Sequence, residues 1–150
     1  MNSNQEFIIF HKSRYSIIGF KNNDVLEVHH NLNDSVFNLD KTISNYQVGS
    51  SIKTVSFDTL QNVYQVKNKT FLVIDNLSVY KSLSFKPEII LLRNSPKINL
   101  NRLIDSLEPE LIISDGSNYK SYQNRWQATC EAKKIPFHKT SEKGAYIITY

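Results

Sequence analysis

Two near-repeats in the second half constrain the fold of this 150-residue chain most strongly. The segments "KPEIILL" (86–92) and "EPELIIS" (108–114) each begin with a charged residue and a proline and continue as an apolar run. Each is followed by a polar turn and by a segment with helical spacing of its apolar residues. Strands that are apolar on both faces and alternate with helices are typical of parallel sheets with right-handed crossovers. The repeats therefore predict two parallel strands of an α/β fold.

The two helices can be placed by their apolar faces. The first is predicted after Asn99, a favourable N-cap residue, and the residues on its apolar face are Leu100, Leu103, Ile104 and Leu107. The second is predicted to run from about Asn118 to Lys133, and the residues on its apolar face are Tyr119, Tyr122, Trp126 and Cys130. Cys130 is the single cysteine, which excludes a disulfide and a cysteine-based zinc site, and this position predicts a buried structural thiol.

The rest of the chain reads mainly as β-strands. Three segments rich in β-branched and aromatic residues, "EFIIFH", "RYSIIGF" and "DVLEVHH", predict an N-terminal antiparallel meander. A hairpin is predicted at 62–75, and two closing strands are predicted at 135–140 and 144–150. The polar stretch 33–50 has weak helical spacing, with Asp34 as a possible cap. We therefore expect one domain over residues 1–150, an α/β fold with a mixed sheet and flanking helices.

Charge and composition limit the classes of function. Hydrophobic residues make up 40% and charged residues 21%, which is ordinary for a globular protein, and no apolar run is long enough to cross a bilayer. The net charge of +4 is concentrated in residues 117–143, which contain six basic and two acidic residues. Such a surface could attract an anionic partner such as DNA, but helical spacing scatters these bases, so a merely solvated basic surface is the alternative.

The order of elements from Thr70 to Ile148 carries a family resemblance. A strand ending in Asp75 ("FLVID") is followed by a strand ending in a polar turn ("EIILLRNSPK"), a helix, the strand "PELIISDGSN" and a long helix. The chain then closes with "TSEKGA" (140–145). This order resembles the later half of the metallo-β-lactamase-like domain at the C-terminus of ComEC-type DNA-uptake channel proteins. The resemblance implies a partial metallo-β-lactamase-like fold and a role in bacterial competence.

The zinc site of that family has no counterpart in this sequence. Such a dinuclear site needs a His-x-His-x-Asp-His cluster, but no two of the four histidines (His11, His29, His30, His138) have this spacing. The adjacent His29 and His30 lie on a predicted strand and should face opposite sides of it. Where the family carries His-His-Gly-Ser, the chain carries Arg93-Asn94-Ser95-Pro96. We therefore expect a degenerate site with no bound zinc and no catalysis.

Two carboxylates keep a catalytic alternative open. Asp75 and Asp115 each end a predicted strand, and with Asn94 and Asn118 they could form an oxygen-rich Mg²⁺ or Mn²⁺ site of a nuclease. The structural alternative is that Asp115 and Gly116 make a tight turn and that Ser117 or Asn118 caps the following helix. We favour the turn, because no further acidic residue is near in sequence.

The same helix start suggests contacts with DNA phosphates. Gly116, Ser117 and Asn118 could offer free backbone N–H groups to a phosphate. The basic residues expected to assist them are Arg93, Lys120, Arg125, Lys133 and Lys134. Tyr119, Tyr122 and Trp126 could stack on bases, although their spacing favours packing in the core.

The expected protein is thus a non-catalytic domain of a ComEC-type competence protein that guides DNA or helps to assemble the channel. The resemblance implies that it is attached to the channel portion of its parent, on the extracytoplasmic face of the inner membrane, and that it is soluble when isolated. The alternatives are the Mg²⁺ or Mn²⁺ nuclease at Asp75 and Asp115 and a plain protein-interaction domain.

Overall fold

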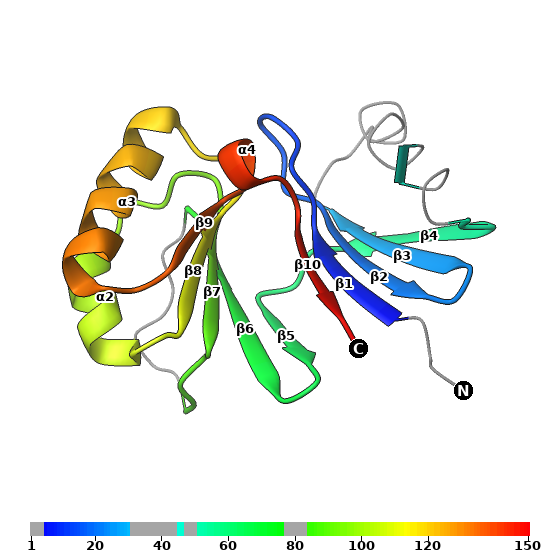
Figure 1. Ribbon diagram of the computed structural model, residues 1–150, viewed down its shortest axis with the longest axis horizontal. Helices are drawn as coiled ribbons and strands as arrows, with labels where there is room; N and C mark the ends of the chain where they lie inside the picture. Colours follow the sequence, from blue (N-terminus) through cyan, green and yellow to red (C-terminus); the bar gives the residue numbers. More distant parts are fainter. Residues whose placement is uncertain (1–4, 31–44, 47–50, 77–83) are drawn as a thin grey trace.

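Two five-stranded β-sheets face each other in the computed structural model, which describes residues 5–30, 45–46, 51–76 and 84–150 (Figure 1). In spatial order, the first sheet consists of β10 (Tyr146–Thr149), β1 (Gln5–Ile9), β2 (Ile18–Asn22), β3 (Val25–His30) and β4 (Thr54–Thr59). The second consists of β5 (Val63–Val66), β6 (Lys69–Ile74), β7 (Ile89–Leu92), β8 (Leu111–Ser114) and β9 (Phe137–Lys139).

The first sheet contains the predicted antiparallel meander of β1, β2 and β3. β4 lies parallel to β3 and places Asp58 opposite His29. The sequence analysis missed β4 because its residues, Thr-Val-Ser-Phe-Asp-Thr, are mostly polar and exposed and give little apolar signal.

The second sheet confirms the parallel pair that the near-repeats predict. Ile90 of β7 lies opposite Ile112 of β8, and β6 and β9 extend the parallel arrangement on either side. The predicted hairpin is also present, as β5 and β6. Because β6 to β9 run in one direction, the residues that follow them meet at one edge of the sheet.

In the described part of the chain, three helices accompany the second sheet: α2 (Leu100–Leu107), α3 (Lys120–Lys133) and the short α4 (Thr140–Lys143). α2 and α3 cover its outer face, whereas α4 lies where the chain crosses between the sheets (Figure 1). Asn99 caps α2 as predicted, since its side chain accepts from the Arg102 backbone N–H at 3.1 Å. α3 begins two residues later than predicted. Tyr119, expected to be buried, is the N-cap and is 70% exposed.

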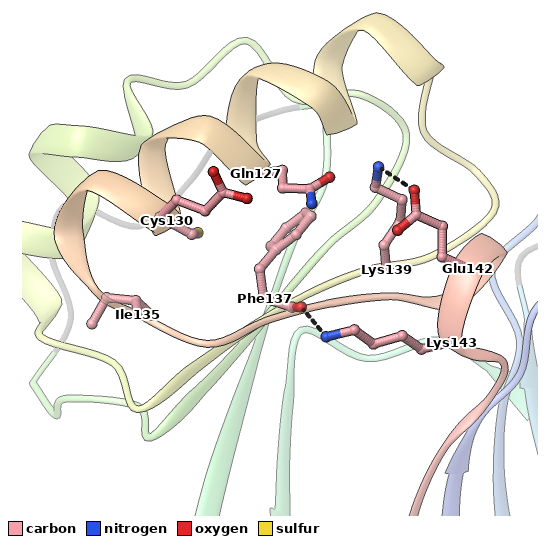
Figure 2. Close-up of a pocket in the computed structure, with 8 residues that line it drawn as sticks. Gln127, Cys130, Ile135, Phe137, Lys139, Glu142 and Lys143 are labelled. Atoms are coloured by element: carbon pink, nitrogen blue, oxygen red, sulfur yellow. Dashed lines mark hydrogen bonds and ion pairs between the residues drawn. The ribbon is translucent and has the colours of Figure 1, made fainter.

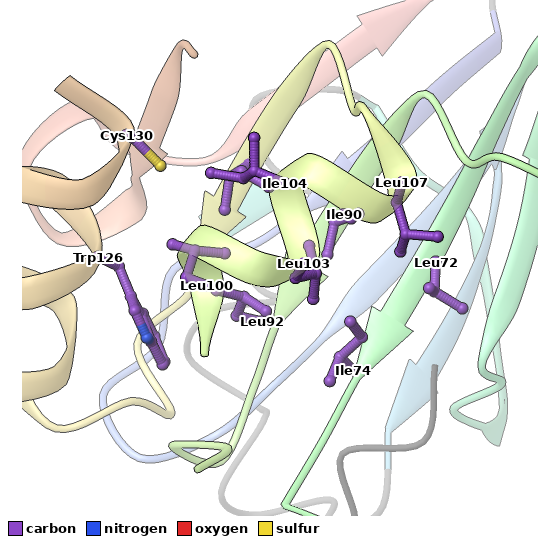
Figure 3. Close-up of a cluster of buried hydrophobic side chains, with 11 residues drawn as sticks. Leu72, Ile74, Ile90, Leu92, Leu100, Leu103, Ile104, Leu107, Trp126 and Cys130 are labelled. Atoms are coloured by element: carbon purple, nitrogen blue, oxygen red, sulfur yellow. The ribbon is translucent and has the colours of Figure 1, made fainter. Parts of the chain in front are cut away.

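The core has three layers. Under the helices, Leu72, Ile90 and Leu92 of the second sheet pack against both helices, which contribute Leu103 and Trp126 (Figure 3). A second layer joins the two sheets, where the rings of Phe7 and Phe71 lie 4.7 Å apart between centroids.

The third core layer covers the outer face of the first sheet, with Ile8, Leu26 and Val28. Alternation along β1 sends Phe7 to one layer and Ile8 to the other, so this sheet is apolar on both faces. The α/β class is thus confirmed, with one correction. The strands form two mixed sheets instead of one, because β9 joins the second sheet and β10 crosses to the first. Most of the predicted segment 33–50, including Asp34, lies outside the described residues.

Candidate functional site

Polar residues follow the parallel strands of the second sheet at its carboxyl edge. Asp75 follows β6, Arg93 follows β7 and Asp115 follows β8, and the turn after β8 adds Ser117 and Asn118. We call these five residues the strand-end site. Such edges commonly hold the ligands of α/β proteins, and the structure brings together here the residues that the sequence analysis singled out.

Arg93 occupies the centre of the strand-end site. Its side chain is buried, with the residue only 7% exposed, and its Nη1 lies 3.7 Å from Oδ2 of Asp75. Burial raises the pKa of Asp115, and the charge of Arg93 is the smallest of the effects that oppose this rise. Guanidinium keeps its proton in proteins and does not bind metal ions. A permanent cation is therefore paired with Asp75, one of the two candidate metal ligands.

Asp115 is fully buried, with no exposed surface. Its Oδ1 accepts hydrogen bonds from the backbone N–H of Ser117 at 3.0 Å and from the Ser117 hydroxyl. Burial raises the pKa of Asp115, and the bonds from Ser117 and Ser16 and the charge of Arg93 oppose this only in part. These contacts form the tight turn considered in the sequence analysis, and they leave the carboxylate inaccessible to a substrate.

The turn after β8 is joined to the turn after β7. Ser117 Oγ accepts from the Asn94 N–H at 2.9 Å, and Asn118 Oδ1 accepts from the Ser95 N–H at 2.7 Å. Asn94 and Ser95 both have positive φ, at 57° and 50°, a conformation that is uncommon for these residues and that such bonds stabilise. Asn118 Nδ2 also donates to the carbonyl of Leu92 at 2.7 Å.

These contacts involve part of the phosphate cradle predicted at Gly116, Ser117 and Asn118. The N–H of Ser117 donates to Asp115 Oδ1, and that of Asn118 donates to the Asp115 carbonyl at 3.4 Å. The N–H of Tyr119 donates to Ser95 Oγ at 2.8 Å. The N–H groups of Ser117 and Asn118 are therefore already bonded within the protein, and the phosphate cradle stays a prediction.

The loop between β1 and β2 docks on the strand-end site at Gly116. The backbone N–H of Arg14 donates to the Gly116 carbonyl at 2.7 Å. A Cβ at position 116 would lie 2.3 Å from the carbonyl oxygen of Lys12, so only glycine fits this approach without a shift. Beside it lies a pocket of about 390 Å³, whose lining includes Lys120, Gln123 and Lys139.

A second pocket, of about 220 Å³, lies between α3, β9 and α4 (Figure 2). Lys139 and Glu142 form an ion pair at 3.1 Å beside it, and Lys143 Nζ donates to the Phe137 carbonyl at 2.9 Å. Cys130 is buried, and burial raises the pKa of its thiol to about 12. At neutral pH the thiolate is negligible, so Cys130 is a structural residue as predicted.

The basic residues of the predicted DNA-binding set separate into two groups. Arg93 is buried, and Lys133 pairs with Asp105 at 2.7 Å. Lys120, Arg125 and Lys134 are exposed and form no ion pair with any residue that the structure describes. We call these three residues the α3 basic set, because they lie along α3 and at its C-terminal end.

The aromatic residues of α3 differ in exposure. Trp126 is buried, as packing in the core requires, whereas Tyr119 is largely exposed at the start of the helix. The ring of Tyr122 lies between its neighbours: it contacts Tyr119, and the Arg125 guanidinium lies 4.6 Å from its centroid. Tyr119 is therefore the one of these three that is open to stacking with a base.

One group of metal-ligating side chains was missed by the sequence analysis. In the described part of the chain, a single set of three His, Cys, Asp or Glu residues converges, and it consists of Glu27, His29 and Asp58. It lies on β3 and β4, on the first sheet. The only sequence signal was the alternation of Glu27 and His29 on one strand, because Asp58 comes from a strand that was not predicted.

Comparison with known proteins identifies the family. The model of a family described as the ComEC C-terminal domain matches residues 7–150, nearly the whole chain. Comparisons with curated proteins and with solved structures give no significant match. Among the described residues, no helix is both long and apolar enough to cross a membrane. The chain therefore belongs to the ComEC C-terminal domain family and is part of a ComEC-type competence protein, whose setting is DNA uptake.

Proposed function

We propose that this chain acts as one domain that guides DNA during uptake and does not cut it. The observation that carries the proposal is the buried Arg93, which pairs with Asp75 and whose charge also acts on the buried Asp115. Metal-assisted phosphodiester cleavage needs carboxylates or imidazoles that converge on a cation, with an open position for water. At the strand-end site a fixed positive charge takes that place, and one of the two carboxylates is inaccessible.

The proposed relation to metallo-β-lactamase-like enzymes would explain why an arginine occupies position 93. On that alignment Arg93 stands where such enzymes carry a histidine ligand, and Asp75 stands where they carry a metal-binding aspartate. An ion pair between these two residues would replace two metal–ligand bonds. The fold would then be a degenerate form of the enzyme, kept for its shape and surface.

DNA contacts are assigned to the α3 basic set and to Tyr119. Exposed Lys and Arg side chains attract phosphates without reading sequence, which suits a protein that must accept any DNA. Tyr119 precedes Lys120 and could add base stacking when the DNA is single-stranded. The domain would act beside the channel portion of its parent, on the extracytoplasmic face of the inner membrane.

The first test is cleavage of end-labelled single- and double-stranded DNA with Mg²⁺, Mn²⁺, Zn²⁺ or a chelator. Intact DNA in every condition is expected. Metal-dependent cutting that disappears in both Asp75→Asn and Asp115→Asn would overturn the proposal and establish the nuclease alternative.

The second test measures DNA affinity against salt concentration for wild type and for Lys120→Glu/Arg125→Glu/Lys134→Glu. Each lost phosphate contact should reduce the slope of log K against log salt by about 1. The matched control reverses three other exposed lysines, Lys53, Lys67 and Lys97, and should lose less affinity. Equal affinities of the two triple variants and wild type would remove the guiding role and leave channel assembly as the function.

A further inference from the structure

The strand pair β3–β4 assembles a group that is separate from the strand-end site. Glu27 and His29 are two residues apart on β3, so their side chains leave the same face of the sheet. Val28, between them, packs on the opposite face, in the outer core layer. Asp58 lies opposite His29 in the parallel register and contributes the third side chain from β4. We call these residues the β3–β4 cluster.

The distances in the β3–β4 cluster approach those of a metal site. One ligand atom from each residue lies within 4.8 Å of the others, and Nε2 of His29 lies 3.4 Å from Oε2 of Glu27. In a tetrahedral zinc site with bonds of about 2.1 Å, neighbouring ligand atoms are also separated by about 3.4 Å. The His29–Glu27 edge therefore already has the required length. Asp58 and Glu27 are exposed, so their side chains can close the remaining gap by changes of rotamer.

The burial of His29 is a second, independent indication that a ligand binds at the β3–β4 cluster. The residue is 4% exposed, and its Nε2 has no hydrogen-bond partner in the described part of the chain. A buried polar atom without a partner is costly and calls for an explanation. This atom lies 3.4 Å from Oε2 of Glu27, and Asp58 belongs to the same group of ligand atoms within 4.8 Å, so a bound cation would satisfy all three side chains at once.

The other ring nitrogen of His29 is held as metal-binding histidines usually are. Nδ1 lies 2.9 Å from the hydroxyl oxygen of Tyr64, which also accepts from the Gln61 N–H at 2.9 Å. That oxygen can accept a second hydrogen bond, from Nδ1–H, and Nε2 then carries the lone pair that a metal needs. Packing against Phe20 and Tyr64, with ring centroids 5.3 Å and 5.5 Å away, further fixes the imidazole.

We propose that Glu27, His29 and Asp58 bind one Zn²⁺ ion, with a fourth position open to water. One imidazole and two carboxylates suit zinc, and the buried imidazole makes a purely oxygen-binding ion such as Mg²⁺ a poor match. The ion would join β3 to β4 and, through Tyr64 of β5, connect the first sheet to the second. This site is independent of the guiding function and uses none of the residues assigned to it.

The site is compatible with the absence of a His-x-His motif. Such a motif brings ligands together along one short segment, whereas here 31 positions separate Glu27 from Asp58. The ligands meet only because β4 pairs with β3. Spacing along the sequence therefore says nothing about this group.

The experiment titrates Zn²⁺ into chelator-treated, tag-free protein in competition with a chromophoric chelator, and records thermal unfolding in parallel. We expect one ion per chain. A free Zn²⁺ concentration of 100 times Kd should raise Tm by roughly 5–10 °C. Cobalt should bind in its place and give the visible absorption of a four-coordinate ion.

The variants locate the ion. Asp58→Asn and Glu27→Gln keep shape at exposed positions, and each should weaken zinc binding at least about tenfold. Tyr64→Phe should weaken it by about 10- to 100-fold through loss of the bond to Nδ1. The matched control is His30→Gln, the adjacent histidine whose ring contacts Phe57 instead, and its affinity should not change.

Two outcomes would overturn the proposal. One is the absence of zinc binding at millimolar concentration in wild-type protein that unfolds cooperatively. The other is wild-type affinity in both Asp58→Asn and Glu27→Gln, which would place the ion at other residues. Neither outcome depends on His29→Gln, so a folding defect in that buried variant does not affect the test.

Discussion

The strand-end site and the β3–β4 cluster both contain carboxylates near a nitrogen side chain, yet they differ in how those groups are satisfied. At the strand-end site, Asp115 is fully buried, Ser117 occupies one of its oxygens, and the cation Arg93 is built into the chain. In the β3–β4 cluster, two exposed carboxylates face a buried His29 nitrogen that has no hydrogen-bond partner within the described residues. Asp115 Oδ2 and Arg93 Nε are also buried without a hydrogen-bond partner among the described residues, so the difference lies in the cation. The strand-end site contains the guanidinium of Arg93, whereas the β3–β4 cluster contains no permanently charged cation.

The difference shows that residue type does not reveal whether a carboxylate is structural or binds a ligand. Asp115 directly follows a buried strand and precedes a glycine, a position typical of catalytic residues in α/β enzymes, but its contacts are those of a turn. Asp58 lies in a polar strand that attracts no notice in the sequence. The contacts of each carboxylate, and not its place in a motif, separate the two cases.

The largest effect that the comparison predicts is the loss of Arg93. Arg93→Met keeps much of the side-chain volume but leaves Asp75 and the buried Asp115 without their cation. Breaking a fully buried pair costs about 3–5 kcal/mol, and the Asp75 side chain is 25% exposed, so we expect a loss of up to about 3 kcal/mol in the free energy of unfolding, measured by urea denaturation. Lys133→Met, which breaks the more exposed pair with Asp105, should cost no more than about 1 kcal/mol. Equal costs in the two variants would show that the strand-end site is not closed by its own cation.

The next effect is a pH dependence caused by Asp115. Burial raises the pKa of Asp115 above its ordinary value of 3.8, so the folded state holds this proton more tightly than the unfolded chain. The resulting stabilisation is complete below pH 3.8 and is lost as pH rises through the folded pKa. Relative to Asp115→Asn, wild type should therefore become less stable above about pH 4, by up to about 1.4 kcal/mol per pH unit within the titration.

Urea denaturation of both proteins between pH 4 and pH 8 measures this difference. Asp105→Asn, at an exposed carboxylate, should give a much flatter difference from wild type over the same range. A difference that moves in favour of wild type as pH rises would mean that Arg93 outweighs burial, and Asp115 would then be an ordinary ion-pair partner.

The sequence predicted much of the second sheet because its signals are local. The proline-led apolar runs predict β7 and β8, and the spacing of Leu100, Leu103 and Leu107 predicts the buried face of α2. Tyr119 was misplaced because the predicted helix began at about Asn118, two residues before the true start of α3 at Lys120. At the N-cap the backbone is not yet helical, so the side chain leaves the face that periodicity predicts.

The separation into two sheets could not be predicted from local patterns. β9 and β10 are both short strands close together in the sequence, and the helix α4 lies between them, where the chain crosses from one sheet to the other. The strand-end site was predicted in outline, since parallel strands end at one edge. Its hydrogen bonds were not, because they depend on the turns of Asn94 and Ser117 meeting in space.

A smaller effect tests how tightly the β1–β2 loop closes the strand-end site. In Gly116→Ala the new Cβ would meet the Lys12 carbonyl at 2.3 Å, which requires a backbone shift. We expect a cost of about 1–3 kcal/mol in the free energy of unfolding, as for other overpacked positions. Ser13→Ala, at an exposed position of the same loop, should be nearly neutral. A neutral Gly116→Ala would mean that the loop moves away easily and that Asp115 is less enclosed than the structure indicates.

The smallest effect concerns the β3–β4 cluster in metal-free protein. Asp58 is exposed, and its Oδ1 accepts from the Thr59 N–H at 2.7 Å, a bond that asparagine can also make. Asp58→Asn should therefore change the free energy of unfolding by no more than about 0.5 kcal/mol when a chelator is present, and it should slightly stabilise the protein if Glu27 and Asp58 repel each other. A clear loss under chelator would make Asp58 a structural residue like Asp115.

With zinc present, the difference between the two proteins should grow, because only wild type gains the full binding energy of the ion. The same carboxylate would then be dispensable for folding and necessary for binding, which is the reverse of the behaviour expected at the strand-end site.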